Sequence, residues 1–312
     1  MEKTLINKQY GVNVIIYSEP DSGKEPLLEF IRNTQKELHI NSYLIDDPDI
    51  MTAISNVVSR KIPVRIIIDG HPYDGSGSES LENLRRTGAQ VNIAPERFEG
   101  DNVFDHAKYM LNEKEYIIGT MNLTDAAFKK NREYFVRGDE RKIHKSLMNI
   151  FNSDWEGKRA GDHDRKYLIV SPDSQNRIFD LLRASKKLFI ETEEIGDDKI
   201  LLEILSSKGK KLKMILPSSI SENDVKNGEE LEKRGVQIRI MDANIRYMHA
   251  KMIHNKKIAF IGSQNFTSTS LMKNREVGLI VKKGRDKKVF MEKFNEDWKN
   301  STEFKKWNRT KK

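Results

Sequence analysis

The sequence contains no cysteine among its 312 residues. This absence excludes disulfide frameworks, thiolate zinc sites and cysteine nucleophiles, and it fits a reducing compartment. Long apolar runs are missing too, since no stretch approaches the ~20 apolar residues that a membrane span needs. The first residues, MEKTLINKQYGVNVIIYSEPDSG, lack the apolar run of a signal peptide. We therefore expect a cytoplasmic protein, with room for peripheral membrane association.

Basic residues are in excess, with 55 Lys and Arg against 47 Asp and Glu and a net charge of +8. Such a balance points to anionic partners such as nucleic acid, lipid headgroups or phosphates. However, the last 14 residues, KNSTEFKKWNRTKK, hold six basic residues and one acidic residue. A segment of this kind is most often a solvated end. We expect a basic tail over 299–312, with contact to a membrane or a nucleic acid as the alternative.

The sequence repeats itself at an offset of 143 residues. The segment 106–155, which begins HAKYMLNEKEYIIGTMNLTD, aligns without gaps to 249–298, which begins HAKMIHNKKIAFIGSQNFTS. Nineteen of the 50 aligned positions are identical, whereas average composition would give about three by chance. Weaker similarity continues upstream, so the chain consists of two repeats of about 150 residues each.

Short apolar runs alternate with helical patterns, which favours an α/β sheet flanked by helices. In the first repeat we expect strands at 12–17, 38–44, 64–69, 91–94 and 116–118, and helices at 25–36, 49–59, 78–87 and 139–155. The second repeat is similar and is expected to close with a helix at 285–298. The predicted fold class is α/β, with two similar repeats, each a mixed sheet, packed pseudo-twofold around one shared active site. The first repeat covers 1–155, a linker covers 156–166, and the second repeat covers 167–298.

Each repeat carries the same polar set, an H-x-K, a G-[TS]-x-N and an N-R-E. On a strand, residues two apart point to the same face, so each His–Lys pair would project side by side. One repeat thus offers an imidazole, an ammonium and an amide, which are the donors that a phosphate binds. The members of the set are His106, Lys108, Asn122 and Glu133 in the first repeat, and His249, Lys251, Asn265 and Glu276 in the second.

Two such sets related by a pseudo-twofold axis would place two histidines across one phosphate. One neutral imidazole can attack phosphorus while the other, protonated, donates to the leaving alkoxide. The lysines would neutralise charge on the non-bridging oxygens. Each glutamate would accept the remaining ring N–H of a histidine and so select its tautomer.

This pattern resembles the signature of the phospholipase D superfamily, H-x-K-x4-D followed by G-[GS]-x-N, in a two-motif, single-chain form similar to phospholipase D and cardiolipin synthase. The resemblance spans about 12–298. It implies an enzyme that forms a covalent phosphohistidine, with His106 as nucleophile and His249 as general acid and then base. It also implies that no metal or other cofactor is needed. The motif's aspartate is replaced by Glu113 and Lys256 in the two repeats.

The hydroxyl groups of Thr120 and Ser263, inside the G-[TS]-x-N elements, are predicted to bind the substrate phosphate. Phospholipid headgroup hydrolysis or transfer is the favoured activity, because the duplicated form with N-R-E-x-G resembles the lipid branch. A metal-independent nuclease acting on DNA or RNA is the alternative, and an inactive phosphate-binding module is the minor one. The expected partner is an anionic phosphodiester, and one chain suffices to build the site.

Overall fold

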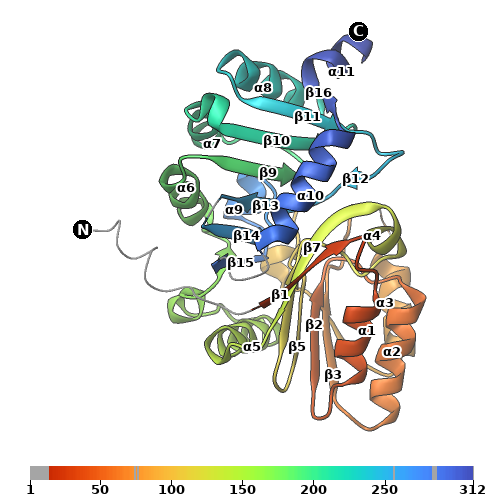
Figure 1. Ribbon diagram of the computed structural model, residues 1–312. Helices are drawn as coiled ribbons and strands as arrows, with labels where there is room; N and C mark the ends of the chain where they lie inside the picture. The colour runs from red at the N-terminus through yellow and green to blue at the C-terminus, as the bar shows by residue number, and fades with distance from the viewer. Residues whose placement is uncertain (1–13, 74, 76, 256, 283–286, 312) are drawn as a thin grey trace.

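The computed structural model describes residues 14–73, 75, 77–255, 257–282 and 287–311, and it contains two sheets, one for each repeat (Figure 1). Positions 12 and 285, where we expected a strand and a helix to begin, lie outside the described residues. Each sheet has eight strands and is flanked by helices. The first sheet reaches eight because one short strand of the second half, residues 247–248, pairs into it. The predicted fold class is confirmed.

The first half pairs its Ile- and Val-rich runs into strands, as the periodicity predicts. Its strands are β1 (Val14–Glu19), β2 (Leu38–Ser42), β3 (Val64–Ile68), β4 (Gln90–Ile93), β5 (Tyr109–Asn112), β6 (Tyr116–Gly119) and β7 (Asn131–Gly138). Its helices are α1 (Glu25–Arg32), α2 (Pro48–Ser59), α3 (Gly77–Arg86), α4 (Asp125–Lys129) and α5 (Arg141–Trp155). Helix α2 begins where the Asp47 carboxylate accepts the backbone N–H groups of Asp49 and Ile50.

The second half follows the same order of elements. Its strands are β8 (Ile169–Ser171), β9 (Leu188–Thr192), β10 (Leu212–Pro217), β11 (Gln237–Met241), β12 (Tyr247–Met248), β13 (Lys251–His254), β14 (Ile258–Gly262), β15 (Glu276–Lys282) and β16 (Thr302–Glu303). Its helices are α6 (Gln175–Ala184), α7 (Lys199–Ser206), α8 (Glu222–Lys233), α9 (Ser268–Met272), α10 (Lys287–Asn300) and α11 (Phe304–Lys311).

The two sheets share one topology, which is mixed in both. Strands β2, β3 and β4 are parallel, and β5, β6 and β7 continue the sheet as an antiparallel meander. The second sheet repeats this with β9, β10 and β11, followed by β13, β14 and β15. The duplication seen in the sequence is therefore a duplication of the whole strand order.

The described residues form three buried apolar clusters, one of which joins the two halves. One lies under α1 and α2 in the first half, and a second under α6 and α7 in the second half. The third contains residues of both halves, including Phe151 of α5 and Phe294 of α10. Trp155 and Trp298 stack on these two rings, with centroid separations of 5.8 and 5.6 Å. The closing helices of the two repeats thus build a core that neither repeat has alone.

The basic C-terminal segment is folded, which corrects the expectation of a solvated end. Thr302 pairs with Ile240 of β11, and Phe304 is 1% exposed within the core of the second half. Its ring lies against Gly228 of α8, where a Cβ would be 2.8 Å from the ring. Trp307 packs on the same core, and Asn308 donates to Glu229 at 2.7 Å, so the segment is fixed by several contacts.

None of the helices in the described parts of the chain combines the length and the apolar character that crossing a bilayer demands.

Candidate active site

The two H-x-K segments lie at the start of corresponding strands. His106 and Lys108 immediately precede β5, and His249 precedes β13, which begins at Lys251. We had expected these residues within strands, which is correct for Lys251 only. The other three lie just before the strands, where each segment pairs with the other half. The Lys108 Nζ atom donates to the His106 carbonyl at 2.7 Å, and Lys251 donates to the His249 carbonyl at 2.8 Å. Histidine and lysine are therefore adjacent, as predicted.

Each histidine is held by the glutamate of the other half. The His106 Nδ1 atom lies 3.1 Å from a Glu276 oxygen, and the His249 Nδ1 atom lies 2.5 Å from a Glu133 oxygen. Both glutamates are fully buried. A carboxylate at Nδ1 selects the tautomer in which that nitrogen carries a proton, so Nε2 is left for chemistry.

Backbone pairing between the halves explains why each histidine contacts the glutamate of the other half. The His106 N–H donates to the Arg275 carbonyl at 2.9 Å, one residue before Glu276. On the other side, Tyr247 and Met248 of β12 pair with Asn131 and Arg132 of β7. Each segment before a histidine therefore lies against the other half's N-R-E, and this places the glutamate within reach.

The hydroxyl groups of Thr120 and Ser263 lie behind the site, which corrects their predicted contact with phosphate. Both residues are fully buried. Thr120 donates to Glu133 at 2.5 Å and accepts the Tyr134 N–H at 3.0 Å. Ser263 accepts the Val277 N–H at 3.0 Å. Because each hydroxyl is used within the protein, its role is to hold the strand that carries a glutamate.

The two asparagines reach the cavity but differ in their contacts. Asn265 donates through Nδ2 to Glu194 at 2.7 Å. Among the residues that the structure describes, the Oδ1 atoms of Asn122 and Asn265 are buried without a hydrogen-bond partner. The preceding glycines leave room for a close backbone approach, since a Cβ on Gly119 would lie 2.9 Å from the Phe135 Cβ.

Burial controls the charge of the site. Burial and the Lys108 ammonium lower the pKa of His106 to about 4, and burial lowers the pKa of Lys108 to about 7. Burial alone would raise the pKa values of Glu133 and Glu276, but the adjacent histidines and lysines hold both pKa values below their usual range. At neutral pH the site therefore has a neutral His106 beside the ionised carboxylate of Glu276.

Sequence reasoning missed the arginines of the N-R-E triplets. Arg132 and Arg275 are fully buried, and each pairs with the aspartate of the other half's closing helix. Arg132 contacts Asp297 at 2.5 and 3.0 Å, and Arg275 contacts Asp154 at 2.8 Å. Both pairs obey the 143-residue offset, so the repeated FNxDW segment was the signal that could have identified them.

Sequence reasoning also missed a carboxylate beside the second histidine. The Glu193 Oε2 atom lies 2.8 Å from the Lys251 Nζ atom and 3.5 Å from the His249 Nε2 atom. Burial would raise the pKa of Glu193, but His249 and Lys251 hold it well below its usual range. In the aligned repeats this position holds Tyr43 in the first half, so the repeat pattern could not reveal it.

Both histidines line one cavity of about 750 Å³ between the halves. The described lining also includes both asparagines, the aromatic residues Tyr43 and Phe104, and carboxylates of the second half. No Lys or Arg is among these lining residues. The lysines of the H-x-K segments are 4% and 0% exposed and lie directly behind the histidines.

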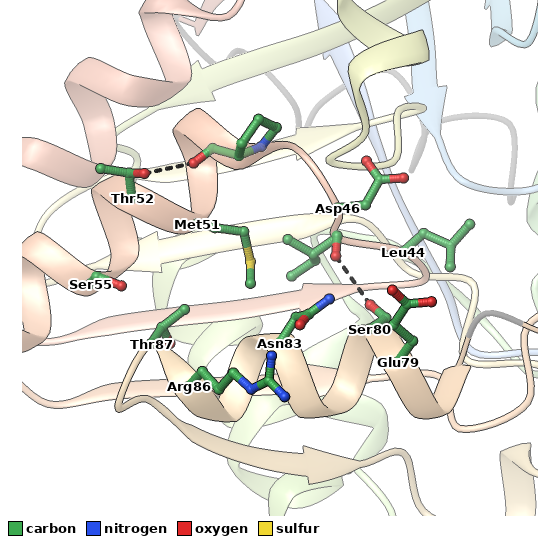
Figure 2. A pocket seen from close by; sticks show the side chains of 12 residues that line it. Leu44, Asp46, Met51, Thr52, Ser55, Glu79, Ser80, Asn83, Arg86 and Thr87 are labelled. Atoms are coloured by element: carbon green, nitrogen blue, oxygen red, sulfur yellow. Dashed lines mark hydrogen bonds between the residues drawn. The ribbon is translucent and has the colours of Figure 1, made fainter.

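A second cavity of about 600 Å³ lies between α2 and α3, away from these residues. Figure 2 shows side chains from the two helices around it, with Ser80 donating to the Ile45 carbonyl. Its Arg86 is paired with Glu82 at 2.5 Å. Because no predicted site residue lines it, we assign the chemistry to the cavity between the halves.

Within the described ranges, no three His, Asp or Glu side chains are grouped as a metal ion would require. Glu113 accepts the N–H groups of Gln35 and Lys36, both at 3.2 Å, and so holds a turn outside the cavity. Its counterpart Lys256 lies outside the described residues.

Comparison with known proteins gives the family. The family model described as "Cardiolipin synthase, PLD-like domain" matches residues 27–155 and 179–298. A phospholipase D from Rickettsia felis is 24% identical over 162 residues, which cover 50% of this chain and 76% of the relative. A mitochondrial cardiolipin hydrolase from Xenopus tropicalis is 26% identical over 145 residues, which cover 46% and 66%.

A solved structure with the same fold spans both halves. The phosphatidylserine synthase from Haemophilus influenzae superposes with a TM-score of 0.71 at 14% identity, over 97% of this chain and 92% of that one. The chain belongs to the cardiolipin synthase, PLD-like family and is thus an enzyme of the phospholipase D superfamily. This confirms the resemblance seen in the motifs, and it makes the protein a phosphodiesterase or phosphatidyltransferase.

Proposed function

We propose that this protein cleaves or exchanges a phospholipid headgroup through a covalent phosphohistidine. The observation that carries the proposal is that each histidine contacts the glutamate of the other half through Nδ1, which brings both histidines to one cavity. The Nε2 atom of His106 is left for substrate, and that of His249 lies 3.5 Å from Glu193. His106 is the nucleophile and His249 is the general acid and base. The neutral state of His106 supports this order.

The reaction has two balanced steps. The His106 Nε2 lone pair forms a bond to phosphorus, the bond from phosphorus to the headgroup oxygen breaks, and His249 transfers its proton to that oxygen. In the second step His249 takes a proton from water or an alcohol, whose oxygen attacks phosphorus as the N–P bond breaks. Asn122 and Asn265, which line the cavity, stabilise charge on the non-bridging oxygens, and Lys108 and Lys251 contribute their positive charge from behind the histidines.

Two features support lipid over nucleic acid. The described lining of the cavity has no Lys or Arg, whereas a groove for DNA or RNA neutralises successive phosphates with such residues. The first-half side of the cavity carries Tyr43, Tyr73 and Phe104, and Tyr73 is 88% exposed at its position in the lining. Exposed aromatic residues of this kind suit the interface between lipid and water.

The test is a parallel assay of labelled phospholipids in mixed micelles, single-stranded DNA and RNA, each with and without EDTA. We expect EDTA-resistant headgroup release by the wild type. The control H163A, which changes an exposed histidine between the two repeats, should release the headgroup at the same rate. In H106A the rate of headgroup release should fall by at least about 100-fold. Acid quenching should trap label from the lipid phosphate on the wild type and not on H106A. Turnover of nucleic acid alone would overturn the lipid assignment, and loss of activity in EDTA would overturn the mechanism.

A further inference from the structure

The cavity has two chemically different sides, although the repeats that form it share one motif set. After β2 the first half places Tyr43, whose ring lies edge-on to His106 at 5.1 Å. After β9 the second half places Glu193, which contacts Lys251 and His249. All four carboxylates in the described lining, Glu193, Glu194, Asp197 and Asp224, come from the second half. The side next to His249 is therefore acidic, although Tyr247 also lines it, whereas the described lining next to His106 has aromatic residues and no carboxylate.

Two of the four carboxylates are already used by the protein. Glu193 is matched by the Lys251 ammonium at 2.8 Å. Asp224 accepts the N–H groups of Ile195 and Gly196, both at 3.0 Å, and so holds the loop after β9. Glu194 and Asp197 have no cation beside them among the described ion pairs, and each accepts one neutral donor, Asn265 Nδ2 and the Ser268 N–H respectively. These two residues can meet a ligand.

Asn265 indicates what kind of group that ligand presents. Its Nδ2 atom donates to Glu194 at 2.7 Å, which orients the amide, and its buried Oδ1 atom has no donor among the described residues. A diester phosphate has no hydrogen to give to an oxygen. The Asn122 Oδ1 atom is unpartnered in the same way, so the second half differs by the Glu194 carboxylate beside its amide. A positively charged donor can satisfy Oδ1 and neutralise Glu194 at once.

Burial strengthens this requirement. Burial and the neighbouring Glu193 raise the pKa of Glu194 to about 7. A carboxylate in this state gains most from a cation that reaches it, because the cation offsets both the desolvation and the repulsion by Glu193.

The direction of the reaction places the leaving alcohol on this side. With His106 as nucleophile, the departing oxygen is opposite the attacking nitrogen and takes its proton from His249. The headgroup therefore leaves past Glu193 and Glu194. The diacylglycerol portion, which stays attached to the phosphohistidine, lies toward Tyr43 and Phe104.

We propose that Glu194, assisted by Asp197 and the Asn265 carbonyl oxygen, binds the ammonium of an amino-alcohol headgroup, so that this protein prefers zwitterionic phospholipids of the ethanolamine type over those with a neutral glycerol headgroup. This inference rests on the proposed headgroup chemistry and deepens it. It assigns substrate preference to residues outside the repeated motif, on the half that carries the general acid.

The test is a competition within one population of mixed micelles that contain phosphatidylethanolamine and phosphatidylglycerol in equal amounts, so that surface effects cancel. The wild type should release ethanolamine faster than glycerol. In E194Q the ratio of the two kcat/KM values should fall by about tenfold, the value of one charged hydrogen bond. D197N should lower the ratio by a smaller factor, because Asp197 is exposed.

A matched control is E203Q, which removes a carboxylate from the exposed face of α7 in the same half and should leave the ratio unchanged. If the wild type hydrolyses both lipids with a ratio near one or favours glycerol, or if E194Q keeps the wild-type ratio, the preference is wrong while the headgroup chemistry stands. If neither lipid is hydrolysed, the proposed function itself fails. D197N provides the same test if E194Q does not fold.

Discussion

At the scale of single residues, the site depends on the charge states of His106 and Lys108. In the proposed mechanism His106 must be neutral to attack phosphorus, and it becomes protonated as the pH falls through its pKa of about 4. Lys108 must be charged to neutralise phosphate oxygens and loses its proton as the pH rises through its pKa of about 7. The kcat/KM profile, which reports the free enzyme, should therefore be bell-shaped between these values.

The substitution K108R tests the alkaline limb. A guanidinium stays protonated throughout this range, so the alkaline limb should move to higher pH while the acid limb stays in place. The measurement is kcat/KM from pH 3.5 to 9 for both proteins. An alkaline limb that stays where it is in K108R would assign it to another group.

The Thr120 hydroxyl gives a second prediction at this scale. Because it holds the carboxylate of Glu133 and does not line the cavity, T120V should lower kcat by roughly tenfold with little change in KM, as expected for loss of a contact behind the reacting groups. T120S keeps the hydroxyl and should restore kcat. A rise in KM in T120V at constant kcat would instead support the phosphate contact predicted from the sequence.

At the scale of secondary-structure elements, the strands of the N-R-E triplets connect the two halves through buried ion pairs. Arg132 of β7 pairs with Asp297 of α10, and both side chains are at most 1% exposed. Removing one partner leaves the other charge buried and unpaired, so D297A should lower the free energy of unfolding by about 3–5 kcal/mol. Urea denaturation measures this value.

Two further variants define what the pair contributes. R132M/D297L removes both charges and should cost less than the sum of the single substitutions, because no unpaired charge remains. E82Q breaks the exposed pair with Arg86 and should change stability by less than about 0.5 kcal/mol. A D297A protein as stable as E82Q would contradict the structural role of the buried pair.

At the scale of the whole molecule, neither half has a complete site or a complete core. His106 takes its glutamate from the second half, and the cluster around Phe151 and Phe294 needs both closing helices. Residues 1–158 and 159–312 produced separately should therefore lack activity. Produced together, they should copurify and recover headgroup release.

A control for this experiment pairs the first half with a second half that carries E276Q. The two fragments should still copurify but turn over much more slowly, because Glu276 positions His106 across the interface. An isolated first half with full activity would show that the exchanged contacts are not needed.

Much of the fold and of the site could be predicted from the sequence. Most predicted strands and helices are present within a few residues, because burial on both faces of the sheet makes them apolar runs. The basic segment at the C-terminus was misread, since only the packing of Phe304 on α8 shows that it is folded. The arginine–aspartate pairs were repeated but not recognised, because a charged residue is normally expected at the surface.

By itself the sequence determined the duplication and the eight repeated His, Lys, Asn and Glu residues, because identity at constant spacing survives without any knowledge of the fold. Only the tertiary structure decided which glutamate holds which histidine, since those contacts join residues 116 and 170 positions apart. It also decided that Thr120 lies behind the cavity and that Glu193 and Glu194 make one side of it acidic. Those features depend on where each side chain ends after packing, and the linear pattern does not contain that information.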